Sequence, residues 1–98
     1  MKAVCIKSHG CPDVVKYLDV DEPVCGKNLI KVKIMASSIN HLDIWVRKGI
    51  KNHPVKFPRI LGSDGSGKVV ELGKNVNRFN IGDDVVIQPG LFSTDSEF

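Results

Sequence analysis

The chain has 98 residues, of which 42% are hydrophobic and 26% charged, and its formal net charge at pH 7 is +3. This length suggests one domain with a modest core, and the composition is typical of a soluble globular protein. The lysines are spread along the chain and alternate with acids, so we expect no basic face and no nucleic-acid partner. No apolar run approaches the roughly 20 residues that span a bilayer, and no signal-peptide cleavage pattern follows the N-terminus. We therefore expect a cytoplasmic protein without a membrane partner.

Short strands dominate the predicted structure. The first covers residues 3–6, and a second, imperfectly alternating strand covers residues 15–20. Residues 30–34 alternate strictly between apolar side chains and lysines, which predicts a half-buried strand. Further strands are expected at 68–72 and 85–87, each bounded by glycine turns. Many short strands with glycine turns are typical of a small barrel or sandwich.

The three cysteines fit a reducing compartment. Their number is odd, and no two of them form a Cys-x-x-Cys pair. Cys5 lies inside an apolar strand pattern and is expected in the core. We interpret all three thiols as chemically inert.

One short helix is predicted at residues 41–48. Asn40 is a favoured N-cap residue, and Asp43 can reach back to it as in a capping box. Two basic residues occupy the last turn, and Gly49 offers a left-handed stop. Trp45 lies on the apolar face of the helix, so it is expected in the core rather than in a substrate-binding wall.

The glycine-rich segment 62–67, followed by Lys68, matches most of a phosphate-binding loop. That loop requires Ser or Thr after the lysine, where this chain has Val69, and it must open a helix. The residues that follow predict a strand instead. A dinucleotide-binding fingerprint must also open a helix, so it is excluded for the same reason. We interpret the glycines as positions where the backbone bends and approaches a neighbouring strand.

Three segments together resemble the medium-chain dehydrogenase/reductase family, which includes zinc-type alcohol dehydrogenases and quinone oxidoreductases. They are residues 34–49, 58–73 and 76–86, and the similarity runs from residue 1 to about residue 89. The resemblance implies a mainly β, GroES-like and partly open barrel with one short helix near residues 41–48. It also implies an oxidoreductase that transfers hydride between NAD or NADP and a small carbonyl, enone or alcohol substrate.

In this family the substrate lies between the GroES-like catalytic domain and a following Rossmann domain, which binds most of the cofactor. The expected domain here is residues 1–98, truncated before the Rossmann domain, because no glycine fingerprint in a βαβ unit of about 30 residues is present. We expect this polypeptide alone to lack dehydrogenase activity, and the full-length protein to form a homodimer or homotetramer.

The resemblance also implies site residues. Asn40 matches a position near the nicotinamide and the substrate, where its amide would stabilise charge as hydride arrives. The catalytic residues that the resemblance implies are Asn40, Asp43 and Ser63, and Asn40 and His41 would contact the cofactor. The resemblance also places Trp45 and Asp64 in the substrate cleft, whereas the helical pattern alone favours a core position for Trp45. Capping alone also explains Asn40 and Asp43, and Ser63 and Asp64 are ordinary turn residues.

A catalytic zinc is not expected. The zinc-dependent members of the family carry a cysteine where this chain has Asn40, and Gly-His-Glu where it has Gly62, Ser63 and Asp64. Zinc takes thiolate, imidazole or carboxylate ligands, and neither an amide nor a serine hydroxyl is a normal ligand. The pattern therefore resembles the zinc-independent, quinone-reductase-like branch.

A stand-alone GroES-like co-chaperonin, or a non-catalytic binding module, is the alternative interpretation. Segments 67–73 and 82–87 also resemble the later strands of the co-chaperonin. A co-chaperonin has no helix like that of residues 41–48, so the capped helix favours the dehydrogenase. A ring-shaped heptamer in solution would favour the co-chaperonin.

Overall fold

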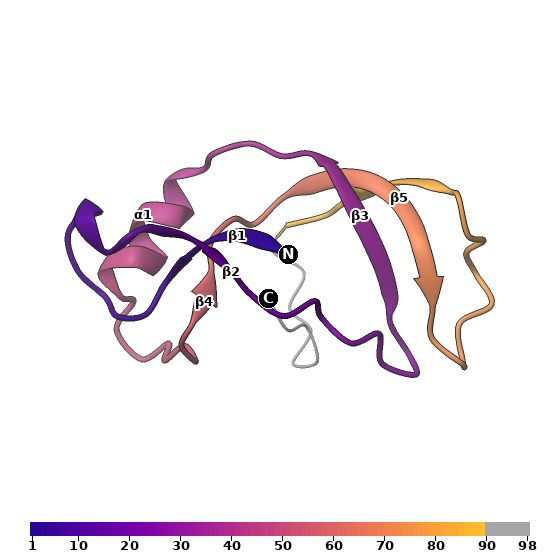
Figure 1. The fold of residues 1–98 in the computed structure, drawn as a ribbon, viewed down its shortest axis with the longest axis horizontal. Helices are drawn as coiled ribbons and strands as arrows, with labels where there is room; N and C mark the ends of the chain where they lie inside the picture. The colour runs from indigo at the N-terminus through magenta and orange to yellow at the C-terminus, as the bar shows by residue number, and fades with distance from the viewer. Residues whose placement is uncertain (90–98) are drawn as a thin grey trace. The chain divides into compact units, whose positions relative to one another are not determined.

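The structure is a computed structural model that describes residues 1–89. These residues are mainly β, with one α-helix, and they divide into two compact units. Within the described part of the chain, unit 1 comprises Met1–Asp21 and Ile39–Ser63, and unit 2 comprises Glu22–Ser38 and Asp64–Pro89 (Figure 1). The C-terminal residues 93–98, from which truncation was expected, lie outside the described residues.

Unit 1 contains a three-stranded antiparallel sheet in the order β2-β1-β4. Its strands are β1 (Lys2–Ile6), β2 (Lys16–Asp19) and β4 (Arg59–Ile60), and a short 3₁₀ helix, η1 (Pro12–Val14), precedes β2. The register places Ala3 opposite Leu18 and Cys5 opposite Ile60. Cys5 and Ile6 are completely buried, so the predicted core position of Cys5 is confirmed.

The α-helix of unit 1, α1 (His41–Lys48), has the predicted bounds. Asn40 is extended, with φ −122° and ψ 156°, and both halves of a capping box join it to Asp43. The Asp43 carboxylate accepts the Asn40 backbone N–H at 3.0 Å. At the other end the helix stops at Gly49 with a positive φ of 98°, as predicted, but its ψ of 133° lies outside the αL region.

Unit 2 contains a second three-stranded antiparallel sheet, in the order β3-β5-β6. Its strands are β3 (Ile30–Ala36), β5 (Gly65–Leu72) and β6 (Asp84–Ile87). Val69 is the buried hydrophobic residue of this unit, at 1% exposure. The predicted apolar face of β3 is covered only in part, since Ile34 remains 48% exposed.

The close approach predicted for the glycine-rich segment occurs at Gly67. This residue lies opposite Ile34 of β3, and a Cβ atom placed on it would overlap the carbonyl oxygen of Lys33. The segment after the glycines is a strand rather than a helix, which agrees with rejecting a phosphate-binding loop.

The mainly β fold with one short helix near residues 41–48 is confirmed. Each sheet keeps two edge strands, so neither three-stranded sheet closes on itself. The two-residue strand β4 and the single turn η1 were not predicted, because elements this short carry no periodic signal. Within residues 1–89, no helix has the length and apolar character that crossing a bilayer requires.

An exposed ion pair in unit 2 gives a pH-dependent prediction. Lys31 Nζ donates to Glu22 Oε2 at 3.0 Å, which lowers the pKa of Glu22 and raises the pKa of Lys31. A carboxylate with a lowered pKa stabilises the fold above its ordinary pKa, and this contribution is lost as the pH falls through the folded-state pKa. We expect Glu22→Gln to be slightly less stable than wild type at about pH 7 and equal to it at about pH 2, with a small difference because the carboxylate is exposed.

Urea unfolding of both proteins at several pH values measures this difference. In a Lys31→Met background the Glu22→Gln substitution should change the free energy of unfolding equally at every pH. A pH-independent difference in the wild-type background would contradict the pairing.

Candidate functional site

The start of α1 brings together three of the predicted site residues. Asn40, Asp43 and Ser63 all belong to unit 1, and each is half-buried. The capping box fixes the Asn40 backbone against Asp43, and the Asn40 side chain donates from Nδ2 to Ser63 Oγ at 3.4 Å. Because the serine oxygen accepts this bond, the Ser63 hydroxyl hydrogen is available to donate elsewhere.

His41 and Trp45 lie one turn apart on the same helix. Their rings make an edge-to-face contact, with centroids 5.2 Å apart and an interplanar angle of 75°. Trp45 is 53% exposed, so its predicted core position is wrong. The i, i+3, i+4 spacing identifies the apolar face of a helix, but it does not determine what covers that face. Trp45 is therefore available as a wall residue.

Asp64, the remaining predicted residue, belongs to unit 2. Its carboxylate accepts the Ser38 backbone N–H at 2.9 Å, and its other oxygen accepts the Ser38 hydroxyl. Ser38 was missed by the sequence analysis. The two residues are 26 positions apart, and no local pattern connects them.

A second missed residue holds the C-terminal end of α1. His9 Nδ1 lies 3.0 Å from the Val46 carbonyl oxygen and 3.3 Å from that of Arg47. Carbonyl oxygens only accept, so this nitrogen carries a hydrogen and donates. The His9 ring also contacts the Phe57 ring edge-to-face, with centroids 5.0 Å apart. Histidine spacing in the sequence gave no sign of this role.

The donor chemistry at these positions does not fit a catalytic zinc. The Asp43 carboxylate is engaged by the helix cap, and the Asp64 carboxylate accepts two bonds from Ser38. Asn40 and Ser63 present an amide and a hydroxyl, which zinc rarely takes as ligands. Among residues 1–89, no three or more His, Cys, Asp or Glu side chains are grouped so that they would hold a metal ion.

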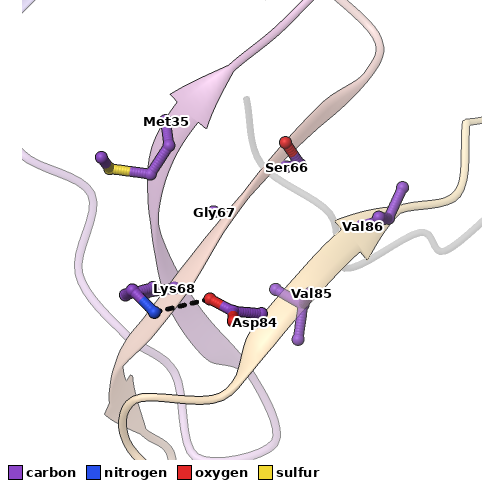
Figure 2. A pocket seen from close by; sticks show the side chains of 7 residues that line it. All are labelled: Met35, Ser66, Gly67, Lys68, Asp84, Val85 and Val86. Carbon is purple, nitrogen blue, oxygen red and sulfur yellow. Dashed lines mark hydrogen bonds and ion pairs between the residues drawn. The ribbon is translucent and has the colours of Figure 1, made fainter.

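Two cavities lie apart from the predicted site residues. One in unit 2, of about 290 Å³, is lined by Met35, Lys68 and Asp84 among others, and Figure 2 shows that they come from three adjacent strands. Lys68 Nζ and Asp84 Oδ1 are 2.6 Å apart there. A cavity of about 380 Å³ in unit 1 is lined by residues that include Cys5 and Pro58. None of the predicted site residues lines either cavity.

Comparison with known proteins identifies the family. The alcohol dehydrogenase GroES-like domain matches residues 26–97. A quinone oxidoreductase of Pseudomonas aeruginosa is 32% identical over 96 residues, which cover 98% of this chain and 29% of that protein. The crystal structure of an NAD-dependent alcohol dehydrogenase superposes with a TM-score of 0.85 at 41% identity, covering 99% of this chain and 28% of the other.

The quinone oxidoreductase of Escherichia coli, solved in complex with NADPH, superposes with a TM-score of 0.79 at 29% identity. The match covers 88% of this chain and 26% of that structure. The chain thus spans less than a third of the length of these relatives. These matches confirm the predicted GroES-like fold and the resemblance to dehydrogenases. The chain belongs to the alcohol dehydrogenase GroES-like domain family, within the medium-chain dehydrogenases/reductases.

Proposed function

We propose that the chain is the catalytic domain of an NAD(P)-dependent oxidoreductase of the zinc-independent, quinone-reductase-like type. Its reaction is hydride transfer to or from a small carbonyl, enone or alcohol. The observation that carries the proposal is the half-buried Asn40, whose backbone is fixed at the start of α1 by Asp43 and whose side-chain amide donates to Ser63. Relatives named as quinone oxidoreductases and alcohol dehydrogenases, one of them solved with NADPH, support it. The proposed protein is cytoplasmic, assembles as a homodimer or homotetramer, and holds most of its cofactor in a separate Rossmann domain.

Neutral hydrogen-bond donors are what this reaction requires near the reacting carbon. The bound nicotinamide supplies or accepts the hydride. As hydride reaches a carbonyl or enone, negative charge develops on the substrate oxygen, and fixed donors stabilise that charge without reorganising. The Ser63 hydroxyl is such a donor, because its oxygen already accepts the bond from Asn40 Nδ2. The Asn40 amide therefore orients the hydroxyl and adds its own dipole beside it.

The surrounding residues of α1 have supporting roles. Asp43 is a positioning residue, since its carboxylate fixes the backbone from which the Asn40 side chain projects. His41 is exposed in the first helical turn, where we place a contact to the cofactor. Trp45, packed against the His41 ring and half exposed, forms part of the substrate wall in this proposal. The role expected for Asp64, which belongs to unit 2, stays a prediction.

Substitution of Asn40 by serine separates catalysis from capping. Serine is as good an N-cap as asparagine, so the Asn40→Ser variant should keep the thermal stability of the full-length protein. It loses the amide, so we expect kcat/KM for quinone reduction with NAD(P)H to fall at least about tenfold. The measurement is steady-state kinetics of the full-length enzyme beside a thermal melt.

Asn77→Ser is the matched control, because Asn77 is an exposed asparagine of unit 2. It should leave both kcat/KM and the melting temperature unchanged. Wild-type kcat/KM in Asn40→Ser would show that capping alone explains Asn40, and the proposed catalytic role would be withdrawn.

A further inference from the structure

A stretch of unit 1 carries positive charge without any acid. Residues 44–63 include no Asp or Glu, yet they contain five basic residues: Arg47, Lys48, Lys51, Lys56 and Arg59. We call these five residues the basic face. The described residues of unit 1 include eight Lys or Arg and four Asp. Those of unit 2 include six Lys or Arg and five Asp or Glu. The prediction of no basic face averaged the lysines over the whole chain, and such an average conceals this stretch.

Three parts of unit 1 that carry residues of the basic face contact one short segment, Ile6–Gly10. His9 contacts both the carbonyl of Arg47 and the ring of Phe57, which adjoins Lys56. The Gly10 N–H donates to the Arg47 carbonyl at 3.1 Å. Ile6 pairs with Arg59 in the β1–β4 ladder. The helix end, the loop after it and β4 therefore all meet this segment.

The charges of the basic face are not neutralised within residues 1–89. The ion pairs found there are Lys2–Asp19, Lys31–Glu22 and Lys68–Asp84, and none involves the basic face. Its three lysines are exposed. The Nε atoms of Arg47 and Arg59 are buried and have no hydrogen-bond partner in the described part of the chain.

The helix dipole explains the positions of only two of the five basic residues. Arg47 and Lys48 occupy the last turn of α1, where cations are favourable. Lys51, Lys56 and Arg59 lie beyond the helix, outside the reach of its dipole. Basic residues without acidic partners leave a local positive potential, which favours an anion.

The basic face and the proposed catalytic end occupy opposite ends of one helix. An eight-residue helix is about 12 Å long, and α1 carries Asn40 before its first turn and Arg47 and Lys48 in its last. The half-exposed Trp45 lies between these ends. A small molecule with an anionic group roughly 10 Å from its reacting group reaches both ends.

We propose that the basic face binds a phosphate or carboxylate group carried by the substrate. Arginine and lysine are the side chains that recognise such groups, and their field also steers anionic ligands toward the site. The substrate is then an anionic carbonyl, enone or alcohol. The identity of its reacting group rests on the proposed function; the anion site does not.

The test uses the 98-residue protein and needs neither cofactor nor turnover. Isotope-labelled protein is titrated with inorganic pyrophosphate and, separately, with citrate, and amide shifts are followed by NMR. We expect shifts concentrated in residues 44–63 and 6–10 and an affinity that falls as salt is added. The anion that binds more tightly distinguishes a phosphate from a carboxylate on the substrate.

Two double variants with the same change in net charge provide the control. Lys51→Glu with Lys56→Glu should weaken binding of the preferred anion about tenfold or more. Lys16→Glu with Lys74→Glu, which change exposed lysines outside the basic face, should weaken it less than about twofold. Melting curves check that all variants are folded.

Equal weakening by the two pairs, or shifts spread over all the lysines, would overturn the proposal in favour of general charge attraction. Tighter binding of a poly-glutamate peptide or an oligonucleotide at the same residues would overturn the assignment to a small-molecule substrate. An active full-length enzyme without this anion site would refute the inference and leave the proposed function intact. Anion binding at the basic face in a full-length protein without oxidoreductase activity would refute the proposed function and leave the anion site intact.

Discussion

The Gly67→Ala variant is expected to lose about 3 kcal/mol or more of its free energy of unfolding. Gly67 lies in the central strand of the unit 2 sheet, opposite Ile34 on one side and Val85 on the other. A Cβ atom here would overlap the Lys33 carbonyl oxygen, which belongs to the backbone of β3. The clash cannot be relieved by turning a side chain, so β3 and β5 must separate and lose ladder hydrogen bonds.

The matched control for this prediction is Gly65→Ala in the same strand. A Cβ atom at Gly65 would lie 3.1 Å from Ile34 Cδ1, which is the far end of a flexible side chain. We expect this variant to lose less than about 1 kcal/mol, because the isoleucine can shift. Urea unfolding followed by circular dichroism, with hydrogen exchange of the β5 amides, compares the two. Equal stabilities would show that β3 and β5 do not approach as closely as described.

The irregular pairing of β3 with β5 explains why a glycine is required at this position. The register shifts between Ile34 and Ala36, immediately beside the Ile34–Gly67 pair. A register irregularity bends the strand and brings backbone atoms closer together. The glycine pattern in the sequence predicted a close approach, but it did not identify the partner, because one sequence does not define the register of two strands that are distant along the chain.

The local parts of the candidate site were the predictable ones. The bounds of α1 follow from Asn40, Asp43 and Gly49, since capping residues act within one helical turn. The Asn40–Ser63 contact spans 23 residues and entered the sequence analysis only through the family resemblance. The Ser38 contact to the Asp64 carboxylate could not be anticipated, because no periodic pattern links a serine to a distant turn.

Exposure was harder to predict than secondary structure. Trp45 lies on the apolar face of α1, and that face remains partly open within the described residues. Hydrophobic spacing shows that a face is apolar, but burial depends on the elements packed against it. The basic face was also overlooked in the sequence. Charge averaged along the whole chain hides residues 44–63, whose β4 part pairs with Ile6 in the fold.

The Ile6→Ala variant is expected to lose about 3 kcal/mol of its free energy of unfolding. The fully buried hydrophobic side chains within residues 1–89 are Cys5, Ile6 and Val69, so unit 1 depends on the first two. Removing most of the Ile6 side chain loses its transfer free energy and leaves a cavity. A small domain is stable by only about 5–15 kcal/mol, so this loss is a large fraction of the total.

Val4→Ala tests whether burial causes the effect, since Val4 belongs to the same strand and is 44% exposed. We expect it to lose less than about 1 kcal/mol, because its methyl groups already contact water in the native state. Hydrogen exchange of β1 and β4 amides should rise more in Ile6→Ala, since Ile6 pairs with Arg59 in that ladder. Equal losses in the two variants would mean that the buried end of β1 does not carry the core of unit 1. If only Ile6→Ala loses stability, β4 should also be less firmly paired in that variant. Anion binding at the basic face should then weaken, because Arg59 belongs both to β4 and to the basic face.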